Sequence, residues 1–501
     1  MPEHIVTFPR AAVSDIPPEV LSRIFLILAK DGGEGATGYS LDWISVTHVC
    51  KFWNQVARNN PILWSSIDFS HPRWAEEKLS RSKSVPLSIN YHHDDIKGRV
   101  DGSHEALLSK ALNRLPLIRT VNIEGPVSIL QGLVEKMHSL PAPLIENLYL
   151  VGTNHEDVDN TLHGNFLNGI APRLRHAIFM GFSIDLSTSL FGGVQTLVLG
   201  PMKQLASIPD TLVLLSNLPK LVELKIAFGF RRPDGADVSR LASMDSVVMH
   251  NCRLMQVIGA EMASQEALAP SSMFLQWVRF TQPVGLEVVL FCGDSIEDTI
   301  FESCEETFGP LRNQFSAKGV RFVELNMVHS VRPERADLEF YARSEDKSYV
   351  MFSLWFRNEA PMDICGQIAF EFATRLPRDD LKLVDIASVD MNELAWCSLF
   401  GQLKRLEEIR AFLYEGLLYA LYEDEEAHEG RPTFPSLSKL TLYYDDEYEE
   451  KSNKNCWEGL PEALKFRAGC GMPVGNIAIL PHGPFPDEYL ACLPEGLVTV
   501  E

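Results

Sequence analysis

The chain has 501 residues, of which 46% are hydrophobic and 22% are charged. This length exceeds what one compact core supports, so we expect several domains or an extended repeat architecture. The composition excludes a disordered chain. The formal net charge of -22 repels phosphate backbones and anionic lipid surfaces, so we expect neither nucleic acid nor a membrane as partner.

The cysteines indicate a reducing compartment. The 9 cysteines are scattered along the chain and never form Cys-x-x-Cys, which is typical of free thiols. The first residues lack the apolar core of a signal peptide, and no apolar run reaches the roughly 18 residues that span a membrane. We therefore expect a cytoplasmic or nuclear protein, and no dense Lys/Arg cluster separates these two locations.

A helix is predicted shortly after an unpatterned tail over residues 1–14. Asp15 followed by Pro17 and Pro18 is a helix-start signal, because the fixed φ of proline suits the first turn. Apolar residues then follow at helical spacing, at Val20, Leu21, Ile24, Phe25 and Leu28. This stripe must be covered by another element.

The next segment predicts two further short helices. A glycine-rich run from Asp31 to Gly38 ends the first helix, and it lacks the Gly-Lys-Ser/Thr ending of a phosphate-binding loop, so we expect a connector. The helical pattern then resumes and stops at Asn60-Pro61. Its apolar members are Trp43, Ile44, Val46, Val49, Cys50 and Trp53. About 50 residues bury little surface alone, so the module over 15–70 depends on a partner or on the rest of the chain.

The module resembles the F-box. The opening pattern Leu/Ile-Pro-x-Glu-x-Leu-x-x-Ile-Phe is matched by Ile16, Pro17, Glu19, Leu21, Ile24 and Phe25. The signature Val-Cys-Lys/Arg-x-Trp is matched by Val49, Cys50, Lys51 and Trp53. The Pro-x-Leu-Trp-Ser of fungal members is matched by Pro61, Leu63, Trp64 and Ser65, and their later Arg-Ser-x-Ser-x-Pro-Leu-Ser-Ile string is found at 81–89. One departure is the glycine-rich segment, which is longer than the connection in most F-boxes.

The resemblance implies docking to the Skp adaptor of a Skp-cullin-F-box ubiquitin ligase, and through it to a cullin-RING ligase. The residues carried over as contacts or as their immediate support are Ile16, Pro17, Pro18, Val20, Leu21, Ile24, Phe25, Val46, Val49, Cys50 and Trp53. The alternative for each is the interior, since about half of such a stripe is core in a small helical module. For Cys50 we expect a small buried hydrophobic residue rather than a nucleophile.

After an expected linker over 71–106, a second pattern occupies 107–501. Apolar residues recur at i, i+3 and i+5, with about 20 to 31 residues between neighbours, close to the leucine-rich-repeat range. The members are Ile118/Val121/Ile123, Ile145/Leu148/Leu150, Leu174/Ala177/Phe179, Val194/Leu197/Leu199, Leu221/Leu224/Ile226, Met244/Val247/Met249, Leu381/Val384/Ile386, Leu406/Ile409/Ala411 and Leu437/Leu440/Leu442. Stacked strand and return units would bury these positions on one another.

The spacing is lost over about 264–380. Two apolar segments on either side of residues 344–347 predict a β-hairpin, and a helix follows through Ile364, Ile368 and Phe372. Two interpretations remain open for this segment: a β-rich excursion from the repeats, or elongated strands of irregular repeats. The fold class we expect is α+β or an α/β repeat, with a three-helix F-box before an irregular leucine-rich-repeat-like solenoid.

No motif for chemistry emerges from the chain. The metal spacings His-Glu-x-x-His and Cys-x-x-Cys are missing, as is the Gly-x-Ser-x-Gly elbow of acyl transfer. We therefore expect no catalytic residue, metal or cofactor, and a non-enzymatic adaptor that holds an unknown protein substrate. Two alternatives remain: an F-box scaffold that recruits nothing for degradation, and an enzyme with a site in the C-terminal part, for example within 264–380.

Overall fold

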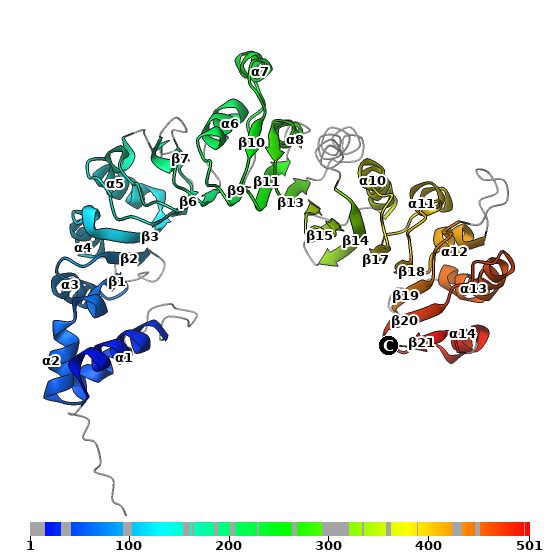
Figure 1. Ribbon diagram of the computed structural model, residues 1–501, viewed down its shortest axis with the longest axis horizontal. Helices are drawn as coiled ribbons and strands as arrows, with labels where there is room; N and C mark the ends of the chain where they lie inside the picture. Colours follow the sequence, from blue (N-terminus) through cyan, green and yellow to red (C-terminus); the bar gives the residue numbers. More distant parts are fainter. Residues whose placement is uncertain are drawn as a thin grey trace, which may run out of the picture. The chain divides into compact units, whose positions relative to one another are not determined.

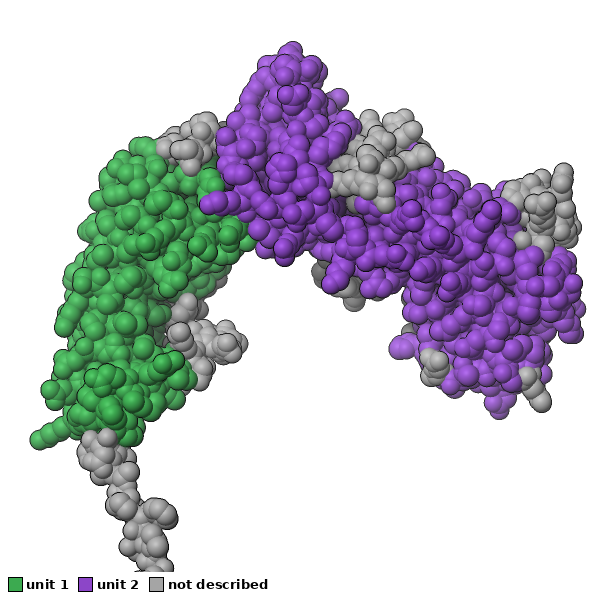
Figure 2. Space-filling model, viewed as in Figure 1, with its two compact units in different colours: residues 1–196 green, residues 197–501 purple. Residues whose placement is uncertain are grey.

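The computed structural model divides into two compact units, Met1–Thr196 and Leu197–Glu501 (Figure 2). The residues it describes are 16–31, 42–93, 103–153, 161–162, 165–184, 189–200, 206–227, 230–262, 268–292, 320–332, 335–356, 362–387, 389–422, 433–445, 451–494 and 496–500. The expected tail and most of the glycine-rich connector lie outside these ranges. No helix within them is long and apolar enough to cross a membrane.

The first unit begins with helices and continues with parallel strands. The helical part holds α1 (Pro18–Asp31), η2 (Asp42–His48), α2 (Lys51–Asn59) and η3 (Pro61–Trp64). The rest holds β1 (Ser66–Asp68), α3 (Pro72–Arg81), β2 (Leu87–His92), α4 (Ser103–Leu112), η5 (Leu115–Leu117), β3 (Ile118–Pro126), α5 (Val127–His138), β4 (Asn147–Thr153), β5 (Thr161–Leu162), η6 (Phe166–Gly169), β6 (His176–Met180), β7 (Ser183–Ile184) and η7 (Ser189–Phe191). β8 (Thr196–Leu199) lies at the unit boundary.

The strands of the first unit form a parallel ladder in the order β1-β2-β3-β4-β6. Helices α3, α4 and α5 pack against one another on one side of these strands (Figure 1). The expected linker over 71–106 is therefore incorrect, because α3 and β2 lie within it. The parallel ladder already begins at Ser66, and Trp64, Ile67 and Phe69 there have the i, i+3, i+5 spacing of the predicted segments and are buried.

The second unit alternates strands with helices. Its first part holds α6 (Ile208–Ser216), β9 (Glu223–Ala227), α7 (Gly235–Ala242), β10 (Val247–Met249), β11 (Leu254–Met262), α8 (Leu268–Gln276), β12 (Val278–Phe280), β13 (Gly285–Cys292), β14 (Phe322–Arg332), β15 (Arg335–Ser344) and β16 (Tyr349–Phe356). Its second part holds α10 (Met362–Arg375), β17 (Leu383–Ala387), α11 (Glu393–Phe400), β18 (Glu408–Phe412), α12 (Glu415–Tyr422), β19 (Lys439–Asp445), α13 (Lys451–Gly469), β20 (Asn476–His482), α14 (Asp487–Cys492) and β21 (Val498–Val500).

One long sheet runs through the second unit, in the order β9-β11-β13-β16-β15-β14-β17-β18-β19-β20-β21. Every pairing is parallel except the two made by β15. Helices α10 to α14 lie on one side of β17 to β21 (Figure 1). Most neighbouring parallel strands of this sheet are joined through a helix, which accounts for the mixed α/β content and the predominance of parallel strands.

The i+3 and i+5 positions of each predicted segment lie in a strand and are buried. In β19, for example, Leu440 and Leu442 are fully buried while Lys439 and Tyr443 are partly exposed. The segment at Met244 does not belong to the long sheet, because β10 pairs only with β12. The neighbouring Cys252, Met255 and Val257 have the same spacing, and their strand β11 joins the long sheet instead.

The irregular segment over 264–380 contains an antiparallel insertion. β14 and β16 run parallel to the rest of the sheet, and β15 runs between them in the opposite direction. The β15–β16 turn lies at the predicted position, where Asp346 accepts the Ser348 N–H at 2.9 Å. The helix expected through Ile368 and Phe372 is α10. The sheet therefore continues through this segment without following the chain order.

Candidate functional site: the N-terminal helical module

The N-terminal helices form a small core of their own. Phe25 and Trp53 have ring centroids 5.1 Å apart, and Trp43 and Trp64 pack edge to face at the same distance. The buried members of this core are Leu21, Phe25, Trp43, Ile44, Val46, Val56, Ala57, Leu63 and Trp64. The core draws on all four helical segments, so the module is held together by its aromatic side chains.

Polar contacts fix how the segments join. The Cys50 Sγ accepts the Trp53 N–H at 3.4 Å and caps α2, and Asn54 donates to the Thr47 carbonyl oxygen at 2.7 Å. The Trp64 indole N–H donates to the Ala57 carbonyl oxygen at 2.9 Å. The Arg81 guanidinium lies 4.3 Å from the Trp64 ring centroid, which ties α3 to the module.

One half of α1 is apolar and exposed. Val20, Ile24, Ile27 and Leu28 are 49%, 39%, 52% and 45% exposed, and we call them the α1 stripe. Their spacing of i, i+4, i+7 and i+8 places them along one face of the helix. Leu21 and Phe25, on the adjoining face, are fully buried in the core. The α1 stripe is a row of large aliphatic side chains that the described residues leave uncovered, which marks an interaction surface.

Further apolar side chains are exposed elsewhere on the module. Val49, which directly follows η2, is 57% exposed, and Ile62 in η3 is 55% exposed. Cys50 is also exposed, as a free thiol whose sulfur caps α2. The role expected for Cys50 as a small buried residue is therefore incorrect, because the N-cap position lies at the surface.

The structure separates the site residues expected from the sequence into two classes. The exposed ones are Pro17, Pro18, Val20, Ile24, Val49 and Cys50. Ile16 and Trp53 are partly exposed, and Leu21, Phe25 and Val46 are buried. The buried three support the surface from beneath, while the exposed ones are available for contact.

Three exposed apolar residues were left out of the contact residues expected from the sequence, namely Ile27, Leu28 and Ile62, although Leu28 was placed on the apolar stripe of the helix. The signal was present for the first two, since Ile27 and Leu28 lie seven and eight positions after Val20 and continue its face. The apolar band of α1 is wider than its core contact requires. This excess width leaves apolar side chains of α1 that the described residues do not cover.

The described residues bear on two kinds of chemistry, metal binding and thiol reactivity. No group of three or more His, Cys, Asp or Glu side chains there could hold a metal ion. The described cysteines are free thiols, and burial together with two carboxylates, Glu415 and Asp390, raises the pKa of Cys456 to about 11. A thiol of that kind is protonated at neutral pH and is a poor nucleophile.

Comparison with known proteins bears on the module directly. Residues 13–70 match the family model described as F-box-like. No curated protein matches the chain. The match covers α1, η2, α2 and η3 and ends just after β1. The chain therefore carries an F-box-like domain at its N-terminal helices, which supports its assignment as an F-box protein.

Proposed function

We propose that this protein is a substrate-recognition adaptor of a Skp-cullin-F-box ubiquitin ligase. In this proposal the F-box-like domain docks the Skp adaptor, the Skp adaptor links it to a cullin-RING ligase, and the long sheet region holds an unknown protein substrate. The observation that carries the proposal is the α1 stripe within a domain of F-box type. Such a ligase operates in the cytoplasm or the nucleus.

The α1 stripe supplies part of the binding free energy that docking needs. Full burial of one aliphatic side chain of this size contributes about 1.5–3 kcal/mol, so four half-exposed ones supply on the order of 3–6 kcal/mol. Association costs several kcal/mol in lost freedom of motion, so the stripe needs help from further contacts. Val49 and Ile62 on the same domain are exposed and could provide them.

The chain itself performs no chemistry in this proposal. The partners carry out ubiquitin transfer, and the adaptor brings a bound protein close to them. This role requires neither a metal nor a cofactor.

Co-purification of the full chain with the Skp adaptor tests the proposal. The variant Ile24→Asp/Leu28→Asp places two charges on the α1 stripe and should abolish co-purification, because a buried charge without a partner is costly. The matched control is Val213→Asp/Val238→Asp, which makes the same change at exposed positions of α6 and α7 and should retain the Skp adaptor. Leu21 is unsuitable for this test, since a charge at a fully buried position would unfold the module.

Equal recovery of the Skp adaptor by the wild-type chain and by the folded stripe variant would refute the docking site. Folding is checked by circular dichroism and thermal unfolding of both variants. The ubiquitin-ligase role has a separate readout, namely the lifetime of proteins bound to the chain. Bound proteins that live equally long with and without this chain would identify a non-degradative scaffold instead.

A further inference from the structure

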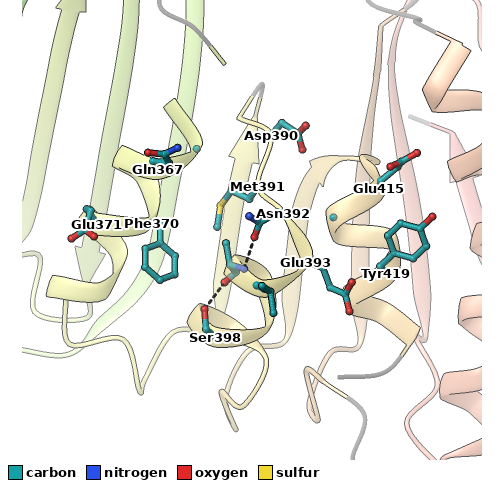
Figure 3. A pocket seen from close by; sticks show the side chains of 14 residues that line it. Gln367, Phe370, Glu371, Asp390, Met391, Asn392, Glu393, Ser398, Glu415 and Tyr419 are labelled. Carbon is teal, nitrogen blue, oxygen red and sulfur yellow. Dashed lines mark hydrogen bonds between the residues drawn. The ribbon is translucent and has the colours of Figure 1, made fainter. Parts of the chain in front are cut away.

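The second unit contains a groove that the spacing of residues in the sequence does not predict. It is a cavity of about 810 Å³ lined by residues within 366–371 of α10, 390–398 before and in α11, and 415–419 of α12. Figure 3 shows these side chains arranged around the start of α11. We call this cavity the α11 groove.

Two glycines shape the groove. A Cβ atom at Gly366 would lie 2.4 Å from the Asp390 carbonyl oxygen, and one at Gly416 would lie 1.9 Å from the Met391 carbonyl oxygen. Helices α10 and α12 therefore approach the loop before α11 from both sides, as no larger residue would allow. Asn392 fixes the loop by capping α11, where its Oδ1 accepts the Ala395 N–H at 2.9 Å. The backbone positions of α10, α12 and the loop before α11 therefore shape the groove.

The charged side chains that line the groove are all acidic. They are Glu371, Asp390, Glu393 and Glu415, and no lysine or arginine lines it. Glu371 is neutralised by Arg375 at 2.6 Å. Asp390 and Glu415 have no ion-pair partner among the described residues, and burial together with repulsion from Glu415 raises the pKa of Asp390. Two carboxylates therefore repel each other at the wall of an open cavity.

Apolar surface lies beside these carboxylates. Leu394 is 63% exposed at the start of α11, and Tyr419 is 50% exposed on α12. Phe370 and Met391 also line the groove. This combination fits lysine or arginine, whose long stems pack on apolar surface while the charged end reaches a carboxylate or an aromatic face.

We propose that the α11 groove binds a short segment of a partner protein in which Lys or Arg side chains alternate with apolar ones. The inference rests on the proposed function, because this segment would belong to the protein that the adaptor holds. A second copy of this chain is a poor occupant, since its net charge of -22 opposes the approach of an acidic groove. A metal ion is also a poor occupant, because no set of three ligands converges in the described residues.

A fluorescent peptide tests the inference with the full chain. The probe is an acetylated heptapeptide that alternates leucine and arginine, and two matched probes replace either arginine by glutamate or leucine by serine. Fluorescence anisotropy should show saturable binding of the first probe, weaker binding of the serine probe and none of the glutamate probe. Affinity should fall between about 0.05 and 0.5 M salt, as expected for exposed charge pairs.

Variants locate the binding. Asp390→Asn/Glu415→Gln removes two charges with little change in shape and should weaken the leucine-arginine probe about tenfold. The control Asp379→Asn/Glu462→Gln makes the same charge change at exposed positions outside the groove and should bind as the wild type does. A second variant, Leu394→Ser, tests the apolar contact at a position too exposed to affect folding and should weaken binding severalfold.

Three results would overturn the inference: no saturable binding, equal binding by the groove and control variants, or tight binding of the glutamate probe. Parallel measurement of Skp-adaptor binding separates this inference from the proposed function. A chain that retains the Skp adaptor but ignores the probe contradicts only the groove. A chain that binds the probe but never the Skp adaptor contradicts the proposed function instead.

Discussion

Helices α1 and α12 both carry several large aliphatic residues, but their surroundings differ. In α12, Leu417, Leu418 and Leu421 are at most 5% exposed, because α11 and α13 pack on either side. In α1, Leu21 and Phe25 are buried while the α1 stripe remains exposed. Helix α12 buries its apolar side chains against neighbouring helices of its own unit, whereas α1 buries only part of its apolar surface within its own domain. The uncovered half is what a partner can use.

We expect the largest loss of stability from a substitution at a fully buried position of the second unit. Leu442 in β19 is fully buried, so Leu442→Ala should lower the free energy of unfolding of the second unit by about 2–5 kcal/mol through lost burial and a cavity. Urea unfolding measures this loss. The exposed Leu394 provides the contrast, since Leu394→Ala should change stability by less than about 0.5 kcal/mol. Similar losses for both variants would contradict the burial pattern.

Helix contact in the second unit can be tested through Gly416. Gly416→Ala places a Cβ against the Met391 carbonyl oxygen and should cost about 1–3 kcal/mol of stability, because the backbone must shift. Gly469 near the end of α13 faces open space, so Gly469→Ala should be neutral or slightly stabilising. Denaturant unfolding compares the two. A neutral Gly416→Ala would show that α12 and the loop lie further apart than described.

A smaller effect is expected where helix α3 meets the F-box-like domain. Arg81→Met removes the cation above the Trp64 ring and its ion pair with Glu77, so it should lower the stability of the module by about 0.5–1 kcal/mol. The matched control is Arg73→Met, at an exposed position of the same helix. Tryptophan fluorescence follows the unfolding of both variants. An equal response would show that Arg81 does not support the module.

The smallest expected effect is a pH dependence of stability that arises from Asp385 in β17. Burial raises the pKa of Asp385, although the Tyr443 hydroxyl donates to both carboxylate oxygens at 3.0 Å. A raised pKa in the folded state favours the protonated form, so this residue's contribution to stability falls as pH rises through the raised pKa. The stability of Asp385→Asn relative to the wild type should therefore be higher at neutral pH than at pH 3. Thermal unfolding at both pH values measures the difference, and the opposite sign would contradict the assignment.

Local periodicity was sufficient to place many buried strand positions. Val121 and Ile123, or Leu440 and Leu442, follow from spacing alone, since one face of each strand must be covered. The insertion of β15 between β14 and β16 could not be predicted, because pairing order depends on contacts between residues far apart in the chain. The strand at Ser66 was missed because the segment after Trp64 was assigned to the helical module.

The surface of the module was predictable only in part. Val20 and Leu21 are both apolar neighbours on one helix, and the sequence does not state which of them the core covers. The α11 groove left no local signal, because Glu371, Asp390 and Glu415 lie on three different elements. Residues that come together only through tertiary packing cannot be identified from their spacing in the sequence.

The most direct test of the central claim is calorimetric titration of the purified chain with the Skp adaptor. The wild type should bind with a negative heat-capacity change, the mark of apolar burial. Ile24→Asp/Leu28→Asp should weaken binding at least about 100-fold, or about 2.7 kcal/mol, while its thermal unfolding matches that of Val213→Asp/Val238→Asp. Unchanged affinity in a folded stripe variant would contradict the claim that the exposed half of α1 is the docking surface.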